Sequence, residues 1–368
     1  MTGRDGRVGV GVIGAGLISN QYLRNMTQFP DLDVVMVADV FADRAAEQAA
    51  TYGVRSSGTP ADAFASDEID LIVNLTNPQA HYEVSSAALA AGKHVYSEKP
   101  FATTREEGQA LLEQAASSGL RIGGAPDTFL GAGLQTARRM IERGDIGTPL
   151  TGLTLFETPG PVDDHRNLKI LLSRGAGPLW DMGPYYITAL TQTLGSFASV
   201  VASGHTARPR RTQIGGPFDG EFDVEVFTHM SVVAQFEGGG QSMSTLSWDS
   251  PHRRVGHVEI VGTEATLSIP DPNEFDGTLK LRRAGEDDWT SIPATGPVGG
   301  RGLGPLDIAR AAATGSQQRV TGELAYHVLD VMASATDSAE SHSWIGVASS
   351  APAASALPED WDPYTRVV

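Results

Sequence analysis

The first third of the chain alternates short apolar runs with segments of helical periodicity. The apolar runs, which are expected to be strands, are residues 8–13, 32–37, 69–75, 94–96 and 120–123. The helical patterns between them are residues 17–28, 44–52, 81–91 and 104–117. Strands that alternate with helices at this spacing are typical of a parallel, doubly wound sheet. We therefore predict an α/β domain over residues 1–125.

After about residue 125 the pattern changes, which predicts a second domain over residues 126–368. Helices are expected at residues 135–143, 179–194 and 323–335, and a strand at 150–156. Short segments of alternating apolar and polar residues follow at 224–226, 232–236, 243–248, 258–261, 266–269 and 279–282. This alternation, with Gly-rich turns between segments, indicates an antiparallel sheet and an α+β domain. Residues 283–305 are expected to form a long loop.

The composition excludes several classes of protein. The 368 residues include 44 acidic and 27 basic side chains, for a formal net charge of −17. Nucleic acids and anionic membranes bind basic surfaces, so neither is an expected partner. No apolar run is long enough to span a membrane, and the N-terminus lacks the apolar core of a signal peptide. The chain has no cysteine, and its His and carboxylate residues show no metal-binding spacing, so no metal is expected. A cytoplasmic protein fits these features.

A glycine-rich turn follows the first predicted strand, in the order Gly14-x-Gly16-x-x-Ser19. In a dinucleotide-binding fold the first glycine allows a tight turn, and the second lets the backbone approach a pyrophosphate. The N-terminus of the next helix attracts that anion. The candidate cofactor contacts here are therefore Gly14, Gly16, Leu17 and Ile18. Serine replaces the third glycine, so the fingerprint is imperfect.

Asp39 ends the second predicted strand, 25 residues after Gly14. An acidic side chain there accepts hydrogen bonds from the adenosine ribose hydroxyls and repels a 2′-phosphate. The residues Val40-Phe41 that follow offer no group for a phosphate. We therefore expect NAD as the cofactor, with NADP less favoured. The alternative interpretation of Asp39 is a solvated turn carboxylate.

Polar residues also follow the third and fourth predicted strands. Thr76, Asn77 and Pro78 lie at an edge where α/β sheets bind ligands, although a capped turn before a helix explains them equally. Lys99 follows the fourth strand and precedes Pro100. A fixed positive charge beside a nicotinamide suits alcohol or ketone redox chemistry. The alternative for Lys99 is a solvated surface lysine.

Asp181 and Tyr185 are four residues apart and would share one face of a helix. They are catalytic candidates, but a capping aspartate and an ordinary buried tyrosine are the alternatives. Pro184 is expected either in the first turn of this helix or at a kink. Further substrate-binding candidates are Asp127, His165 and Arg166, which lie in predicted loops.

Taken together, these motifs resemble the Gfo/Idh/MocA oxidoreductases over nearly the whole chain. The resemblance rests on residues 12–16, 77–81, 91–100, 141–147, 175–183 and 261–264. It implies an N-terminal Rossmann domain that binds the dinucleotide and a C-terminal α+β domain with an open, mostly antiparallel sheet. One face of that sheet commonly forms the oligomer interface in the family. A homodimer or homotetramer is therefore expected.

The resemblance also implies roles for individual residues. The family's lysine maps onto Lys99, in a peptide with proline that is often cis, and its substrate-binding aspartate maps onto Asp181. The family's usual catalytic histidine is replaced by Tyr185, as in a subgroup in which a histidine at the position of His165 is a substrate-contact candidate. Two further cofactor contacts are implied, at His81 and Glu98.

The expected activity is hydride transfer between NAD and a hydroxyl-bearing carbon of a sugar, sugar derivative or cyclitol. Tyr185 would move the hydroxyl proton, Lys99 would stabilise the phenolate and the alkoxide, and Asp181 would orient a neighbouring hydroxyl. Two alternatives remain open. One is an NAD-dependent enzyme that cleaves glycosides by transient oxidation of the sugar, and the other is a non-catalytic ligand sensor.

Overall fold

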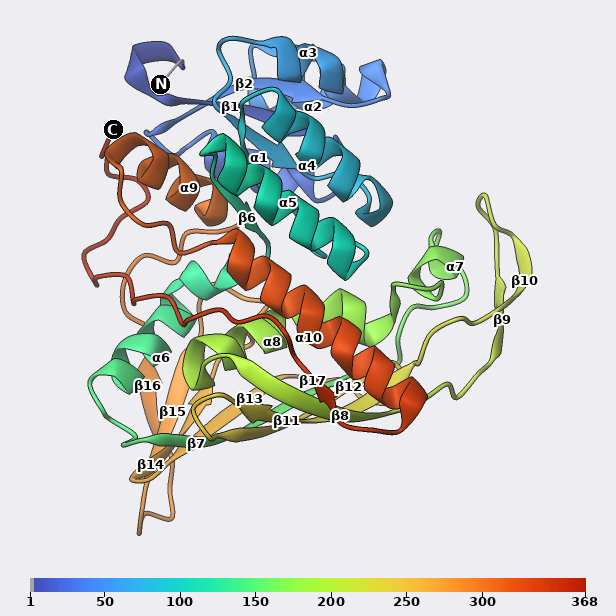
Figure 1. The fold of residues 1–368 in the computed structure, drawn as a ribbon, viewed down its shortest axis with the longest axis vertical. Coiled ribbons are helices and arrows are strands. Elements are labelled where there is room, and N and C mark those ends of the chain that lie inside the picture. Colours follow the sequence, from blue (N-terminus) through green and yellow to red (C-terminus); the bar gives the residue numbers. More distant parts are fainter. Residues whose placement is uncertain (1–2) are drawn as a thin grey trace. The chain divides into compact units, whose positions relative to one another are not determined.

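The computed structural model describes residues 3–368, which pack into two compact units (Figure 1). The first unit contains the chain up to residue 135 together with residues 295–329 and 354–368. The second unit contains residues 136–294 and 330–353. Packing thus groups two C-terminal segments with the N-terminal sheet. The predicted functional division at residues 125/126 stays a prediction.

The first unit is built on a six-stranded sheet with the order β3-β2-β1-β4-β5-β6. Its strands are β1 (Val8–Ile13), β2 (Leu32–Ala38), β3 (Ser56–Gly58), β4 (Leu71–Asn74), β5 (His94–Ser97) and β6 (Ile122–Gly124). Every neighbouring pair is parallel. This is the strand order of the Rossmann fold, in which the order reverses between β1 and β4. The predicted doubly wound sheet is confirmed.

Helices surround this sheet and bury a common apolar core. They are α1 (Ser19–Met26), α2 (Ala42–Tyr52), α3 (Pro60–Ala65), α4 (His81–Ala90), α5 (Arg105–Ser118) and α9 (Leu303–Thr314). Short 3₁₀ segments are η1 (Arg4–Gly6), η2 (Pro78–Ala80) and η3 (Thr128–Leu130). The core contains Ile13, Ile72 and Val95 from the strands, with Leu89 and Leu111 from the helices.

The second unit is built on a nine-stranded sheet with the order β16-β15-β14-β13-β7-β12-β11-β8-β17. The strands are β7 (Pro149–Glu157), β8 (Phe197–His205), β11 (His229–Phe236), β12 (Gln241–Ser247), β13 (Arg254–Gly262), β14 (Ala265–Ile269), β15 (Thr278–Arg283), β16 (Thr290–Pro293) and β17 (Ile345–Gly346). All neighbouring pairs are antiparallel except β7 and β12. The prediction of a mostly antiparallel sheet is confirmed.

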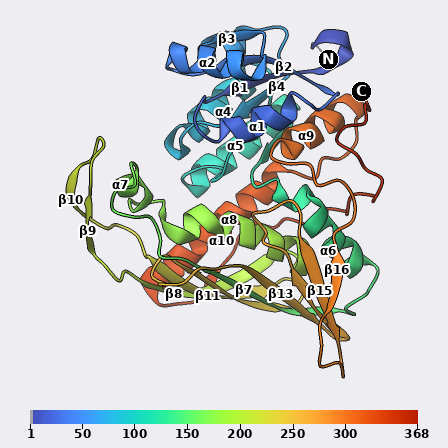
Figure 2. The ribbon, with the colours of Figure 1, turned by 180° about the vertical axis from the view of Figure 1, so that it is seen from behind.

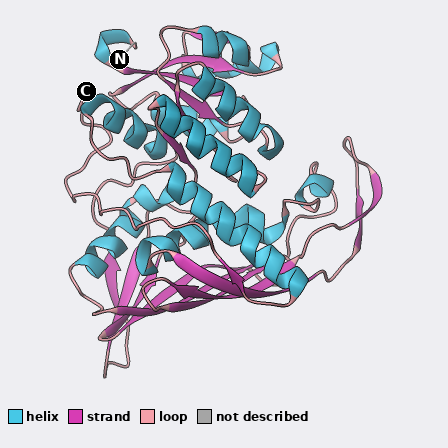
Figure 3. Cartoon of the chain, in the orientation of Figure 1, coloured by secondary structure: helices cyan, strands magenta, loops and turns pink. Residues whose placement is uncertain are grey.

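Helix α8 (Gly177–Leu194) covers one face of the large sheet, as Figure 2 shows from behind. The other helices outside the first group are α6 (Ala132–Glu142), α7 (Leu168–Leu171) and α10 (Gly322–Ser341). A separate hairpin of β9 (Arg210–Gln213) and β10 (Gly220–Asp223) projects from the second unit near α7 (Figure 3). Among the described residues, no helix is long and apolar enough to cross a membrane.

The structure corrects the sequence analysis at several elements. The predicted loop at residues 283–305 contains β16 and the start of α9. Residues 224 and 226 lie outside the strands, and β11 begins at His229. The sequence analysis missed β8 and the β9–β10 hairpin, whose residues are largely polar or small.

Candidate active site

The four loops that carry the predicted cofactor residues begin at the same edge of the Rossmann sheet. The last residues of four strands are paired in one row across the sheet, Ala38 with Ile13, Ile13 with Asn74, and Asn74 with Ser97. The chain therefore continues from this row into Asp39, Gly14, the Thr76 loop and Lys99. Parallel α/β sheets bind ligands outside this carboxyl edge, where the strand order reverses.

The glycine turn after β1 has the backbone that a dinucleotide site requires. Gly14 has a φ of 106°, and a Cβ there would lie 2.6 Å from the carbonyl oxygen of Leu75. A side chain is excluded by both the conformation and the space. At Gly16 a Cβ would meet nothing within 4 Å, so the backbone faces open space. This is where a pyrophosphate approaches the chain in a Rossmann fold.

The start of α1 is open to an anion. Its N-cap residue, Ile18, provides no side-chain hydrogen bond to the helix, and Leu17 is exposed. Ser19 is buried, and its hydroxyl donates to the carbonyl oxygen of Gly16 at 2.6 Å. Ser19 thus closes the turn at the position of the fingerprint's third glycine. The residues of this turn fit a dinucleotide, because the backbone faces open space at Gly16 and the positive end of the α1 dipole attracts phosphate oxygens.

Asp39 fastens the end of β2 to the glycine turn. Its Oδ2 accepts a hydrogen bond from the Ala15 amide at 2.7 Å, and its Oδ1 accepts one from the Phe41 amide at 2.9 Å. The carboxylate therefore lies beside the turn that would hold the cofactor. The sequence analysis did not consider Arg44, whose guanidinium carbon lies 4.4 Å from the centroid of the Phe41 ring. Arg44 is thus a cation near Asp39, the residue predicted to favour NAD over NADP.

Asn74, the last residue of β4, shapes the loop that contains Thr76, Asn77 and Pro78. Its buried Oδ1 accepts hydrogen bonds from the Thr76 amide at 3.2 Å and the Thr76 hydroxyl at 2.6 Å. Thr76 is half-buried and Asn77 is exposed, so the loop presents polar groups at the sheet edge. Their contact with a cofactor stays a prediction.

The Lys99 turn is anchored by a buried carboxylate. Oε2 of Glu98 accepts the Lys99 amide at 2.9 Å, and Oε1 accepts the Tyr22 hydroxyl at 2.8 Å. The Tyr22 and Tyr96 hydroxyls are 3.1 Å apart. Burial, followed by the charge of Glu98, raises the pKa of Tyr22 well above its usual value, so this phenol stays a donor. The Lys99–Pro100 peptide is cis.

Asp127 is wholly buried, and its contacts are those of a helix cap. Its Oδ2 accepts the amides of Gly302 at 2.9 Å and Gly304 at 3.0 Å, at the start of α9. Burial raises its pKa to about 6. Substrate binding by Asp127 stays a prediction; its other oxygen, Oδ1, is buried and has no hydrogen-bond partner among the described residues.

In the second unit, α8 carries Asp181 and Tyr185 one helical turn apart. Asp181 is half-buried and Tyr185 is 5% exposed. Pro184 lies inside the helix, seven residues after its first residue Gly177, so of its two predicted places the first turn is excluded and a kink stays a prediction. The helix runs through this proline to Leu194.

Tyr186, the next residue, makes its hydrogen bond to the backbone of β13. Its buried hydroxyl accepts a hydrogen bond from the Gly256 amide at 2.9 Å. Burial, followed by the charge of Asp271, raises the pKa of Tyr186 well above its usual value. Tyr186 thus fixes the bend in β13, which makes it a structural neighbour of the catalytic candidate.

His165 and Arg166 lie on an exposed loop that precedes α7. The fully buried side chain of Gln213, in β9, holds this loop. Its Nε2 donates to the Arg166 carbonyl at 2.9 Å, and its Oε1 accepts the Lys169 amide at 3.0 Å. The sequence analysis missed Gln213, because a contact across more than forty residues leaves no local pattern.

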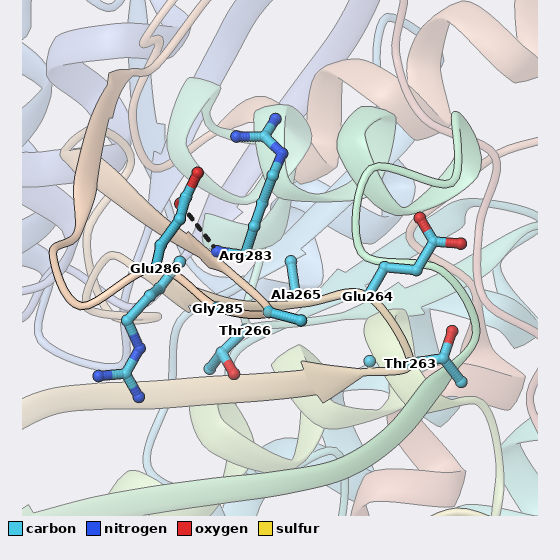
Figure 4. A pocket seen from close by; sticks show the side chains of 10 residues that line it. Thr263, Glu264, Ala265, Thr266, Arg283, Gly285 and Glu286 are labelled. Atoms are coloured by element: carbon cyan, nitrogen blue, oxygen red, sulfur yellow. Dashed lines mark hydrogen bonds between the residues drawn. The ribbon is translucent and has the colours of Figure 1, made fainter.

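A polar pocket in the second unit contains none of the predicted site residues. It lies between the β13–β14 turn and the end of β15, where Thr263, Glu264, Arg283 and Glu286 contribute side chains (Figure 4). The Arg283 amide donates to Glu286 at 3.1 Å. We do not assign the reaction to this pocket. Within residues 3–368, no group of His, Asp and Glu residues is arranged to hold a metal ion.

Comparison with known proteins identifies the family. Residues 8–124 match the oxidoreductase family with an NAD-binding Rossmann fold, and residues 134–268 match the GFO/IDH/MocA C-terminal domain. The chain belongs to the Gfo/Idh/MocA oxidoreductase family. Its members share the two-part architecture seen here, which confirms the expected fold and dinucleotide binding.

Individual relatives are similar along most of their length. Inositol 2-dehydrogenase 3 of Saccharopolyspora erythraea is 27% identical over 288 residues, which are 77% of this chain and 79% of that protein. The 1,5-anhydro-D-fructose reductase of Ensifer adhaerens is 30% identical over 325 residues, 84% of this chain and 98% of the reductase. A levoglucosan dehydrogenase solved with NADH and L-sorbose shares the fold, with a TM-score of 0.82, 22% identity and coverage of 93% and 99% of the two chains.

Proposed function

We propose that this protein is an NAD-dependent dehydrogenase or reductase that acts on a hydroxyl-bearing carbon of a sugar, sugar derivative or cyclitol. The observation that carries the proposal is the row of strand ends in one sheet: Asp39 and the glycine turn follow the adjacent strands β2 and β1, and Lys99 follows β5, two strands from β1. Two relatives are named for a cyclitol and an anhydrosugar, which supports a polyhydroxylated substrate.

The residues divide the chemistry as follows. A bound nicotinamide supplies the acceptor or donor of the hydride. The ammonium of Lys99 stabilises negative charge that develops on the reacting oxygen, and Tyr185 takes or returns the hydroxyl proton. A free phenol has a pKa of about 10, so a neighbouring cation is needed to make it a useful base near neutral pH. Asp181 accepts a hydrogen bond from a second hydroxyl and orients the ring.

A substrate panel tests this proposal directly. The protein would be incubated with NAD or NADP and myo-inositol, levoglucosan or simple hexoses, and with NADH and 1,5-anhydro-D-fructose, while absorbance of the reduced cofactor is followed. Turnover of at least one polyol is expected. Glycosides belong in the same panel, since their cleavage without net NADH production would support the glycoside-cleaving alternative. Tight binding without any turnover would support a sensor.

We propose that NAD is preferred over NADP because of Asp39. Replacing Asp39 by alanine should weaken NAD binding and relax discrimination against NADP, since a ribose acceptor and a repulsive charge are lost together. The exposed Arg44 would then be free to pair with a 2′-phosphate. The measurement is the ratio of kcat/KM for NAD and NADP. Asp39→Asn keeps acceptor capacity for the Ala15 amide, so it separates the loss of charge from the loss of the turn. An unchanged ratio in both variants would leave Asp39 only a turn residue.

We further propose that the open face of the large sheet forms a homo-oligomer interface. Val233, Met243 and Leu153 are paired in one row across three strands and are 37%, 55% and 38% exposed. Exposed apolar side chains that adjoin each other indicate an interaction surface. They lie on the opposite face of their strands from the buried residues that α8 covers.

Met243→Glu should shift the protein toward smaller species, because two copies would each place a charge in an apolar contact. Sedimentation velocity or light scattering would measure the change. Ile214→Glu is the matched control, since it adds the same charge at an exposed apolar side chain outside the large sheet. An unchanged mass for Met243→Glu, or an equal shift for both variants, would contradict this assignment.

A further inference from the structure

His81, the first residue of α4, connects two loops of the first unit. Its side chain is almost wholly buried, and Nδ1 lies 2.7 Å from the carbonyl oxygen of Pro100. Nε2 lies 3.0 Å from the carbonyl oxygen of Thr76. Pro100 belongs to the turn that carries Lys99, and Thr76 belongs to the loop after β4. One imidazole therefore contacts the backbone of both loops.

A neutral imidazole can donate to only one of these carbonyls, because it has a single N–H. Burial lowers the pKa of His81 and the charge of Lys99 lowers it further, while the two carbonyls and the Glu98 carboxylate oppose this shift. The ring therefore holds one proton at neutral pH. The shorter distance, 2.7 Å from Nδ1 to the Pro100 carbonyl oxygen, favours the tautomer with the proton on Nδ1.

The backbone of His81 is fixed independently of its ring. The buried Asn74 donates from Nδ2 to the His81 carbonyl oxygen at 3.0 Å and to the Ser85 hydroxyl at 3.0 Å. The Glu98 amide donates to the Asn74 carbonyl at 2.8 Å. Asn74 also holds Thr76 through its Oδ1, so the Thr76 loop has support besides the ring. The Nδ1–H of His81 is thus a donor held in place by β4.

We propose that His81 is a positioning residue for Lys99, an inference that rests on the function proposed above. Its Nδ1–H fixes the Pro100 carbonyl, and with it the backbone from which the Lys99 side chain extends. The Glu98 carboxylate accepts a hydrogen bond from the Lys99 amide. Without the histidine bond the turn loses its anchor at the Pro100 carbonyl, so the Lys99 ammonium is displaced from the reacting oxygen.

Two substitutions at this position separate the two ring nitrogens. An asparagine amide reaches about as far as Nδ1 of histidine, and a glutamine amide about as far as Nε2. His81→Asn should keep the bond to Pro100 and most of the turnover. His81→Gln should keep only the Thr76 contact and lose about 10²-fold in kcat, the scale of a small misplacement of a catalytic group. The KM for NAD should change little in either variant. Ser85→Ala is the control, since it disturbs Asn74 and leaves the ring unchanged.

The readouts are kcat and the KM for NAD, with the most active polyol of the panel as substrate, and NADH affinity from quenching of tryptophan fluorescence. Loss of kcat in His81→Gln, with recovery in His81→Asn, supports the positioning role. Equal kcat in all variants would overturn it, as would a fall in kcat that follows only the fraction of folded protein. If the wild-type protein neither binds NADH nor turns over a polyol, the proposed function fails and this inference fails with it. NADH binding and polyol turnover by the wild type, with equal kcat in all variants, would show that only the positioning role of His81 fails.

Discussion

Lys99→Met should lower turnover by about 10²–10³-fold, the usual loss when one group that stabilises a developing oxyanion is removed. Methionine keeps the length of the side chain and removes its charge. The turn should survive, because Glu98 binds the Lys99 backbone amide and His81 contacts the Pro100 carbonyl. NADH binding should therefore persist. The measurement combines kcat for the most active polyol with NADH affinity from tryptophan fluorescence.

Lys93→Met provides the matched control for the loss of a positive charge in the same unit. Its Nζ donates to the Ser66 carbonyl at 2.8 Å, at the other end of β5 from Lys99. This variant should keep normal turnover. Near-normal turnover in Lys99→Met, or an equal loss in both variants, would remove Lys99 from the reaction.

The common sheet edge at which the candidate cofactor residues lie could be predicted from sequence, because it depends on local rules. Each strand of a parallel sheet ends at the same edge, so residues directly after the strands come together whatever the loops do. Gly14, Asp39 and Lys99 follow Ile13, Ala38 and Ser97–Glu98 in this way, and the strand pairing places them as expected. The positive φ of Gly14 explains why the sequence signal there is a glycine.

Features that depend on distant contacts could not be predicted. Asp127 was selected as a polar loop residue, but it caps α9, whose first residues lie more than 170 positions later. Helix α9 itself was missed because its Gly304-Pro305 pair is typical of a loop, although its apolar residues are buried. Pro184 lies inside α8 and not in its first turn, which excludes one of its two predicted places; the kink stays a prediction.

The assignment of Tyr185 is tested against its neighbour Tyr186, since one atom is removed from each of two adjacent phenols. If Tyr185 transfers the proton, Tyr185→Phe should lower kcat by about 10²–10⁴-fold, the usual contribution of a general acid or base. The pH dependence of kcat should also change in this variant, because the phenol proposed to titrate is lost. The ring remains, so the folded structure should persist, as circular dichroism and thermal unfolding would show.

Tyr186→Phe should show the reverse pattern. The Gly256 amide, in a partly buried part of β13, would lose its acceptor, which costs about 0.5–1.5 kcal/mol in the free energy of unfolding. Turnover of the folded fraction and its pH profile should be nearly unchanged. A variant pair in which Tyr185→Phe keeps its activity and Tyr186→Phe loses it would move the proton path away from Tyr185. Loss in both variants, with normal pH profiles and lowered stability, would make both tyrosines structural residues of α8.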